Sequence, residues 1–87
     1  MHIDFSKFKI KDIEGNDVEV DISKPLGNAI YFGASDISQA DLGREIYKRG
    51  AVALTRKQAE FIRGFIKTMS WPVRTAYEEF LNNKRDE

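Results

Sequence analysis

The sequence predicts an α+β domain, in which an N-terminal β-hairpin with a possible third short strand packs against three to four helices. Two observations support this fold class. Apolar residues alternate with polar ones up to Ile22, whereas beyond it they recur every three or four residues. The chain has 87 residues, of which 41% are hydrophobic and 32% charged, a composition that supports one modest core. We therefore expect a single domain over residues 1–87, with residues 82–87 as a frayed polar tail.

The hairpin is predicted from two alternating segments and the turn between them. The first segment contains apolar residues with one slip of phase, typical of a bulge or of two short strands: Ile3, Phe5, Phe8 and Ile10. Residues 14–17 (E-G-N-D) tolerate the positive φ that a tight turn needs. The second segment alternates with acidic residues at 17, 19 and 21: Val18, Val20 and Ile22. We expect one acidic, solvated face and one buried face.

Two helices are predicted between residues 23 and 50. Ser23 caps the first, Pro25 fits its first turn, and Gly33 terminates it. Its expected buried stripe consists of Leu26, Ala29 and Ile30. The second begins with a capping box over residues 38–41 (S-Q-A-D), buries Leu42 and Ile46, and ends at Lys48, Arg49 and Gly50.

The second of these helices contains Gly43. A glycine there costs about 1 kcal/mol relative to Ala. Close approach of another backbone would explain its presence.

The remaining elements are a short strand and two helices. Val52 and Leu54 are expected to add the third strand beside the hairpin. Thr55 and Gln58 form a second capping box, followed by a helix with the apolar stripe Ile62, Phe65, Ile66 and Met69. Pro72 bends the chain and lies in the first turn of a final helix, whose stripe is Val73, Ala76, Tyr77, Phe80 and Leu81.

Side chains that commonly perform catalysis or bind metals are scarce. The chain has one histidine, His2, and no cysteine. A single imidazole near a chain end lacks the partner that orients a working base or ligand. Glu78 and Glu79 diverge by about 100° on a helix and cannot converge on a substrate. We expect no catalytic, metal or cofactor site, and no enzymatic activity.

Charge is distributed unevenly along the chain. Residues 1–42 carry eight acids and four lysines, and residues 43–87 carry ten bases and six acids, so the halves have net charges of −4 and +4. This asymmetry suggests head-to-tail association or contact with a charged partner, although the halves could instead complement each other within one fold.

The basic side chains are concentrated between residues 44 and 74, where eight bases meet two acids. The candidate interaction surface contains six of these bases and the single tryptophan: Arg49, Arg56, Lys57, Arg63, Lys67, Trp71 and Arg74. Such a surface could neutralise nucleic-acid phosphates, or it could consist of ordinary solvated helix faces. Surplus aromatic residues beside arginine are also typical of protein interfaces: Tyr31, Phe32, Tyr47, Phe61, Trp71 and Tyr77.

Three segments within residues 26–58 carry a resemblance to known sequences: L-G-N-A-I-Y, D-L-G-R-E-I-Y-K-R-G and V-A-L-T-R-K-Q. They resemble small uncharacterised phage and prophage proteins, often encoded near structural or tail modules, in which L-G-x-x-[IL]-Y and a later V-x-L-T-x-x-[QE] recur. The resemblance covers Leu26 to Gln58, about a third of the chain. It implies an assembly or interaction role and brings no catalytic residues.

The sequence thus favours a small non-enzymatic protein that binds a protein partner or itself. The alternative is a nucleic-acid-binding accessory factor that uses the basic region from Arg44 to Arg74. We expect a cytoplasmic location without membrane association. The chain lacks a secretory signal and any apolar run of the roughly 20 residues that cross a bilayer, and it has no cysteine for disulfides.

Overall fold

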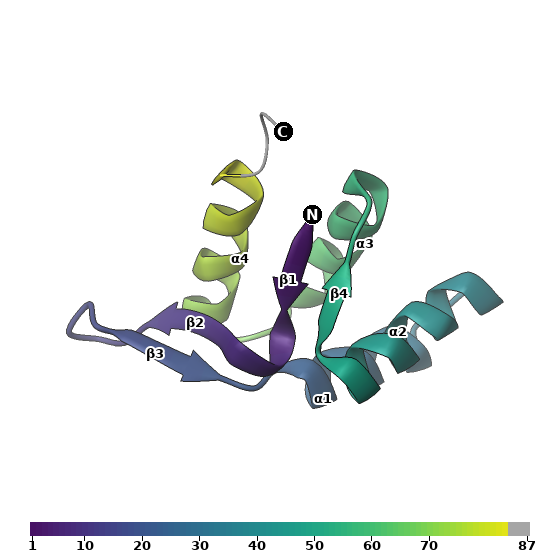
Figure 1. The fold of residues 1–87 in the computed structure, drawn as a ribbon, viewed down its shortest axis with the longest axis horizontal. Helices are drawn as coiled ribbons and strands as arrows, with labels where there is room; N and C mark the ends of the chain where they lie inside the picture. Colours follow the sequence, from purple (N-terminus) through teal and green to yellow (C-terminus); the bar gives the residue numbers. More distant parts are fainter. Residues whose placement is uncertain (84–87) are drawn as a thin grey trace.

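The chain adopts the expected α+β fold in the computed structural model, which describes residues 1–83. In chain order the elements are β1 (His2–Asp4), the short 3-10 helix η1 (Phe5–Lys7), β2 (Phe8–Lys11), β3 (Asp17–Val20), α1 (Ser23–Phe32), α2 (Ile37–Arg49), β4 (Ala51–Ala53), α3 (Arg56–Ile66) and α4 (Trp71–Asn83). The β2–β3 hairpin projects from one end of the molecule, and α1 and α2 lie at the other (Figure 1). Of the predicted tail, Asn82 and Asn83 are the last residues of α4, and residues 84–87 lie outside the described part.

The strands form two separate antiparallel pairs. β1 pairs with β4, with Ile3 opposite Val52, whereas β2 pairs with β3. The predicted third strand therefore exists, but it lies beside β1 and not beside the hairpin. The reason is the slip of phase in the sequence: η1 turns the chain between β1 and β2, and so directs the two strands to different partners. Phe5 marks this junction, since its N–H donates to the Gly50 carbonyl at 2.9 Å and its carbonyl accepts from the Ile22 N–H at 2.8 Å.

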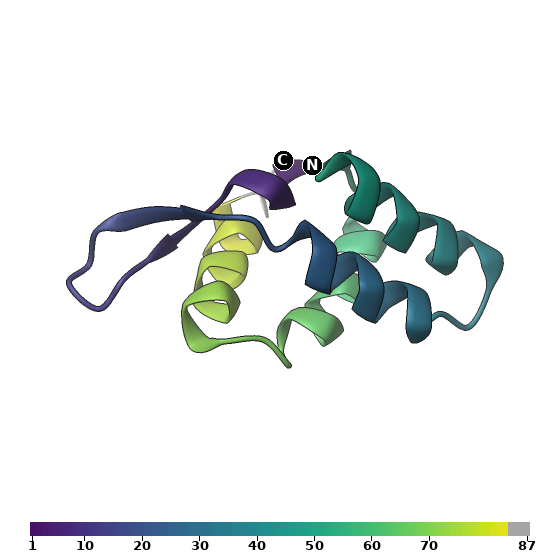
Figure 2. The ribbon, with the colours of Figure 1, turned by 90° about the horizontal axis from the view of Figure 1, so that it is seen from below.

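The hairpin does not bury the face that its alternation predicts. Of the apolar residues in β2 and β3 only Phe8 is fully buried, although Ile22, just after β3, is buried as expected. Ile10 and Val20 are half-buried, and the Val18 side chain is 38% exposed. The expectation of a buried face is therefore wrong for the outer part of the hairpin, because that part extends beyond the helices and has nothing to pack against (Figure 2).

Helices α1 and α2 lie antiparallel and very close together (Figure 2). Leu26 and Ile30 are buried as expected, but Ala29 is exposed and Gly27 occupies the buried position instead. A Cβ on Gly27 would lie 2.8 Å from the Gly43 carbonyl oxygen, and a Cβ on Gly43 would lie 2.9 Å from that of Gly27. The expected close packing at Gly43 is confirmed, with Gly27 as its counterpart.

Two of the predicted helix caps lie elsewhere in the structure: the N-cap of α1 is Ile22, and that of α2 is a carboxylate. Ser23 is the first residue of α1 and not its cap, and its N–H and hydroxyl both donate to Asp21. The cap of α2 is Asp36 and not Ser38, because the Asp36 carboxylate accepts the Gln39 N–H at 2.9 Å. A charged oxygen accepts a more strongly stabilising hydrogen bond at a helix N-terminus than a hydroxyl. The capping box of α3, from Thr55 to Gln58, is present as expected.

The core lies between the two strand pairs and the inner faces of the helices. It contains Ile62 and Ile66 of α3, while Met69 lies beyond the end of that helix and is half-buried. Tyr77 of α4 is fully buried, stacks on Phe5 and donates its hydroxyl proton to the Ala59 carbonyl at 2.7 Å. Burial raises the pKa of Tyr77 well above its usual range, so the phenol stays neutral and acts as a structural donor.

Candidate interaction surfaces

The predicted basic residues are distributed over three places in the fold. Arg56, Arg63 and Lys67 share one side of α3, because they are spaced seven and four residues apart. Lys57 lies on another side of α3, where it borders a different hollow together with Asp36 and Phe61.

The other three candidates lie at helix ends. Arg49 is the last residue of α2 and lies 3.8 Å from Glu45. Trp71 and Arg74 belong to the first turn of α4, where the guanidinium carbon lies 5.8 Å from the indole ring centroid. The seven candidates therefore do not form one continuous surface.

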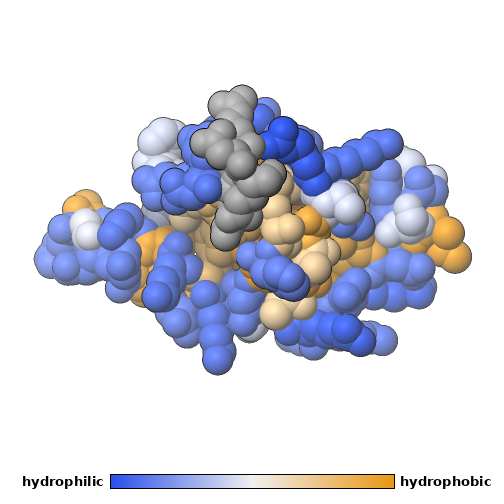
Figure 3. Space-filling view, turned by 45° about the horizontal axis from the view of Figure 1, so that its top comes forward, coloured by the Kyte–Doolittle hydropathy of each residue, from blue (hydrophilic) through white to orange (hydrophobic). Residues whose placement is uncertain are grey.

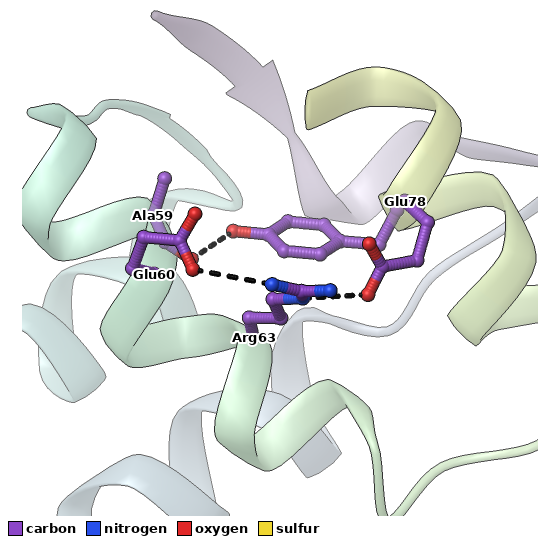
Figure 4. A network of polar contacts seen from close by, with 5 residues as sticks. Ala59, Glu60, Arg63 and Glu78 are labelled. Atoms are coloured by element: carbon purple, nitrogen blue, oxygen red, sulfur yellow. Dashed lines mark hydrogen bonds and ion pairs between the residues drawn. The ribbon is translucent and has the colours of Figure 1, made fainter. Parts of the chain in front are cut away.

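On the basic side of α3, Arg63 is paired with two carboxylates. The Arg63 Nε donates to Glu78 of α4 at 2.7 Å, and its Nη1 lies 3.5 Å from Glu60 (Figure 4). The hydrogen bond that Arg63 donates to Glu78, together with both negative charges, raises the pKa of the Arg63 guanidinium. A small hollow here is bordered by Arg56 and Arg63 but also by both glutamates. The arrangement links α3 to α4 and leaves less positive charge for an external phosphate.

The surplus aromatic residues divide into packed and exposed groups. Tyr77 is buried, and Phe61 is half-buried with its ring edge-on to Phe65 at a centroid distance of 5.2 Å. Trp71 and Phe32, in contrast, are 71% and 82% exposed. Large aromatic side chains with this exposure are candidates for contact with another molecule.

A large hollow lies between the hairpin and α4, and we call it the arm groove. Its volume is about 870 Å³. One wall is formed by β1 and the length of β2, and the other is provided by Trp71, Thr75, Ala76 and Glu79 of α4. Ile13, whose side chain is fully exposed in the hairpin turn, borders its outer end. The groove thus combines apolar side chains with the backbone of a strand.

A cluster of exposed apolar side chains lies at the opposite end of the molecule, at the turn between α1 and α2. We call it the turn cluster, and it consists of Tyr31, Phe32 and Ile37. The Tyr31 and Phe32 rings meet edge-on at 5.5 Å, and Ile37 is 77% exposed. The space-filling view shows hydrophobic surface at both ends of the molecule (Figure 3).

Sequence reasoning singled out Phe32 but missed Ile13 and Ile37, because each adjoins a turn and lies outside any apolar repeat. A large apolar side chain beside turn residues, as in Asp12-Ile13-Glu14 or Asp36-Ile37-Ser38, is the signal that identifies them.

Within residues 1–83, no group of three or more His, Cys, Asp or Glu side chains is arranged to hold a metal ion. In the same residues, each buried side-chain nitrogen or oxygen has a hydrogen-bond partner. No described helix combines the length and the apolar character needed to span a membrane. What these surfaces offer chemically is contact: apolar area, backbone hydrogen bonds and mixed charge. Comparison with protein-family models, with curated proteins and with solved structures gave no match in any of the three.

Proposed function

We propose that this chain is a small non-enzymatic interaction or assembly protein that holds a protein partner against its exposed apolar surfaces. The observation that carries the proposal is the exposure of four large apolar side chains at two ends of one small domain: Ile13, Phe32, Ile37 and Trp71. Single exposed apolar residues are common on protein surfaces, but exposed tryptophan and phenylalanine are typical anchors of interfaces.

The origin that we propose is a phage or another mobile element. The support is the resemblance of residues 26–58 to small phage and prophage proteins. In the structure, these residues include the helical pair that presents the turn cluster. We propose the cytoplasm as the compartment, on the sequence grounds given above.

The test uses variants of the arm groove and of the turn cluster in capture experiments from the native host. We expect Ile13→Ser with Trp71→Ser, or Phe32→Ser with Ile37→Ser, to abolish capture of a protein that the natural chain retains. Glu14→Ser is the matched control, because Glu14 is exposed beside Ile13 and contributes no apolar area. Size-exclusion chromatography with light scattering measures self-association in parallel. A chain that stays monomeric and captures no protein contradicts the proposal.

Nucleic-acid binding is the alternative, and the paired state of Arg63 gives it less support. It is tested by titration with DNA and RNA at low salt. Binding that weakens steeply with salt, and is lost in the double variant Arg56→Glu with Arg63→Glu, would favour it. Unchanged signals in both titrations would remove it.

A further inference from the structure

Strand β2 has a sheet partner on only one of its edges. It pairs with β3, with Ile10 opposite Val18, and just beyond the strand the Asp12 N–H donates to the Asn16 carbonyl at 2.9 Å. Backbone groups alternate between the two edges of an antiparallel strand. Those of Ile10 therefore face β3, as those of Asp12 do, and those of Lys9 and Lys11 face away from it.

The unpaired edge of β2 borders the arm groove. In Figure 1, β3 lies along one side of β2 and α4 rises from the other. The groove is lined by β2 and by the small side chains Thr75 and Ala76 of α4, with the exposed Trp71 at one end. Its volume of about 870 Å³ lies within the range of roughly 300–1,000 Å³ that is typical of ligand sites.

The side chains of β2 define what such a chain must carry. In the hairpin, Glu19 lies opposite Lys9, and Asp17 lies opposite Lys11 with an ion pair of 2.6 Å. The residues between them are apolar, with Val18 opposite Ile10. Directly opposed charges of opposite sign and opposed apolar pairs both stabilise strand pairing. A strand on the free edge meets the same side chains, so it should alternate acidic and apolar residues as β3 does.

Pairing between copies of this chain is disfavoured by the same residues. Two β2 edges would bring Lys9 and Lys11 opposite lysines, and two β3 edges would bring Asp17 and Glu19 opposite acids. Neighbouring strands lie about 4.8 Å apart. If β3 of one copy paired with β2 of the next in the same orientation, the copies would repeat every two strands, or about 10 Å. The shortest dimension of the molecule is 21 Å, so such copies would overlap. The charge pattern and the space favour a segment of another protein.

We propose that the free edge of β2 binds an extended segment of a partner protein, in which acidic and apolar residues alternate, as an added antiparallel strand in the arm groove. This inference rests on the proposed function and specifies the chemistry of the partner. Backbone hydrogen bonds to Lys9 and Lys11 give the affinity, while the alternation gives the specificity.

The experiment titrates a blocked synthetic peptide of sequence DVEVDI, that of residues 17–22, into the protein. Trp71 is the only tryptophan and lines the groove, so its fluorescence reports binding. We expect a saturable change with DVEVDI and none with KVKVKI, which keeps the apolar positions and reverses the charges. Equal responses to both peptides, or no response to either, would overturn the inference.

Two variants of Lys9 test the register. Lys9→Pro removes an N–H that faces the groove and that the hairpin does not use, and it should weaken DVEVDI binding about tenfold. The matched control is Glu19→Pro, which removes an outward N–H from β3 and should leave binding unchanged. Lys9→Glu should weaken DVEVDI about fivefold and bring KVKVKI into measurable binding.

Circular dichroism establishes which variants fold. If Lys9→Pro does not fold, the binding of the two peptides to Lys9→Glu tests the inference instead. A folded Lys9→Pro that binds DVEVDI as the natural chain does would overturn the inference. So would an oligomer that DVEVDI dissociates, since the occupant would then be a second copy. If Lys9→Glu leaves capture of the host partner intact while the cluster variants abolish it, the inference fails and the proposed function stands.

Discussion

The α1–α2 pair and the β2–β3 hairpin are both antiparallel pairs joined by a turn, yet they use their apolar residues in opposite ways. The helical pair buries Leu26, Ile30, Leu42 and Ile46, whereas the hairpin buries only Phe8. The helices touch through Gly27 and Gly43 and leave no room for a Cβ at either position. The hairpin extends from the core with no further strand on either edge and with much of its apolar face open.

This difference separates the part of the chain that provides stability from the part that is available for contact. Burial of apolar area contributes roughly 25 cal/mol per Å², and most of that area lies in the helices and the β1–β4 pair. A two-stranded hairpin is at best marginally stable by itself. The hairpin is therefore held by its base at Phe8, and substitutions in its outer part should cost little.

The largest expected effect comes from filling the contact between α1 and α2. Gly43→Ala introduces a Cβ 2.9 Å from both the Gly27 carbonyl oxygen and the Tyr31 nitrogen, which are backbone atoms that cannot move independently. We expect the free energy of unfolding, measured by urea denaturation, to fall by about 2–3 kcal/mol. An unchanged midpoint would mean that the helices are not closely packed.

Loss of the buried tyrosine hydroxyl should have the next largest effect. Tyr77→Phe removes the donor to the Ala59 carbonyl without changing the volume of the ring. We expect the free energy of unfolding to fall by about 1 kcal/mol. Urea denaturation at pH 7 measures the loss, and an equally stable variant would show that the hydrogen bond contributes nothing.

The same tyrosine should make stability depend on alkaline pH. Burial raises the pKa of Tyr77, so the folded state retains a proton that the unfolded state loses above pH about 10. The contribution of Tyr77 is therefore full below the unfolded pKa and declines as pH rises through it. Between pH 8 and 10.5, the natural chain should lose more stability than Tyr77→Phe. Parallel declines in the two proteins would contradict this.

A smaller effect of opposite sign is expected at Gly64. It is an exposed residue within α3, and a Cβ there would have no neighbour within 4 Å. Gly64→Ala should raise the free energy of unfolding by about 0.5–1 kcal/mol, because alanine restricts the unfolded chain. It is also the control for Gly43→Ala, since the two variants make the same chemical change. A loss of stability at Gly64 would indicate an unrecognised contact there.

The smallest effect is expected in the hairpin. Val18→Thr replaces one β-branched residue by another at a position that is 38% exposed. We expect a change within about 0.5 kcal/mol in the free energy of unfolding. A loss above 1 kcal/mol would show that the outer hairpin belongs to the stability core and would remove the distinction drawn above.

Local signals in the sequence predicted local structure well. The Thr55–Gln58 capping box, the end of α2 at Gly50 and the close contact at Gly43 each follow from the preference of a residue for one conformation or one neighbour. The slip between Phe5 and Phe8 indicated a bulge or two short strands, and the structure has two strands separated by η1. It could not indicate that they belong to different sheets.

Features that depend on distant residues were not predictable in the same way. The compensation of Arg63 by Glu78 joins residues 15 apart on two helices, so the charge count of the basic region overstated its exposed charge. The free edge of β2 arises because β4 pairs with β1 instead, which no periodicity encodes.

The junction at Phe5 sets the direction in which the hairpin projects from the core. Its ring is fully buried against Tyr77, while its backbone is tied to Gly50 on one side and Ile22 on the other. From Phe8 to Ile13, five steps between extended residues would span about 17 Å at roughly 3.3 Å each. A rotation of about 10° at the junction would shift the tip by about 3 Å over that span. The direction of the arm is therefore set by one of the most deeply buried residues of the domain, far from the surface that a partner would touch.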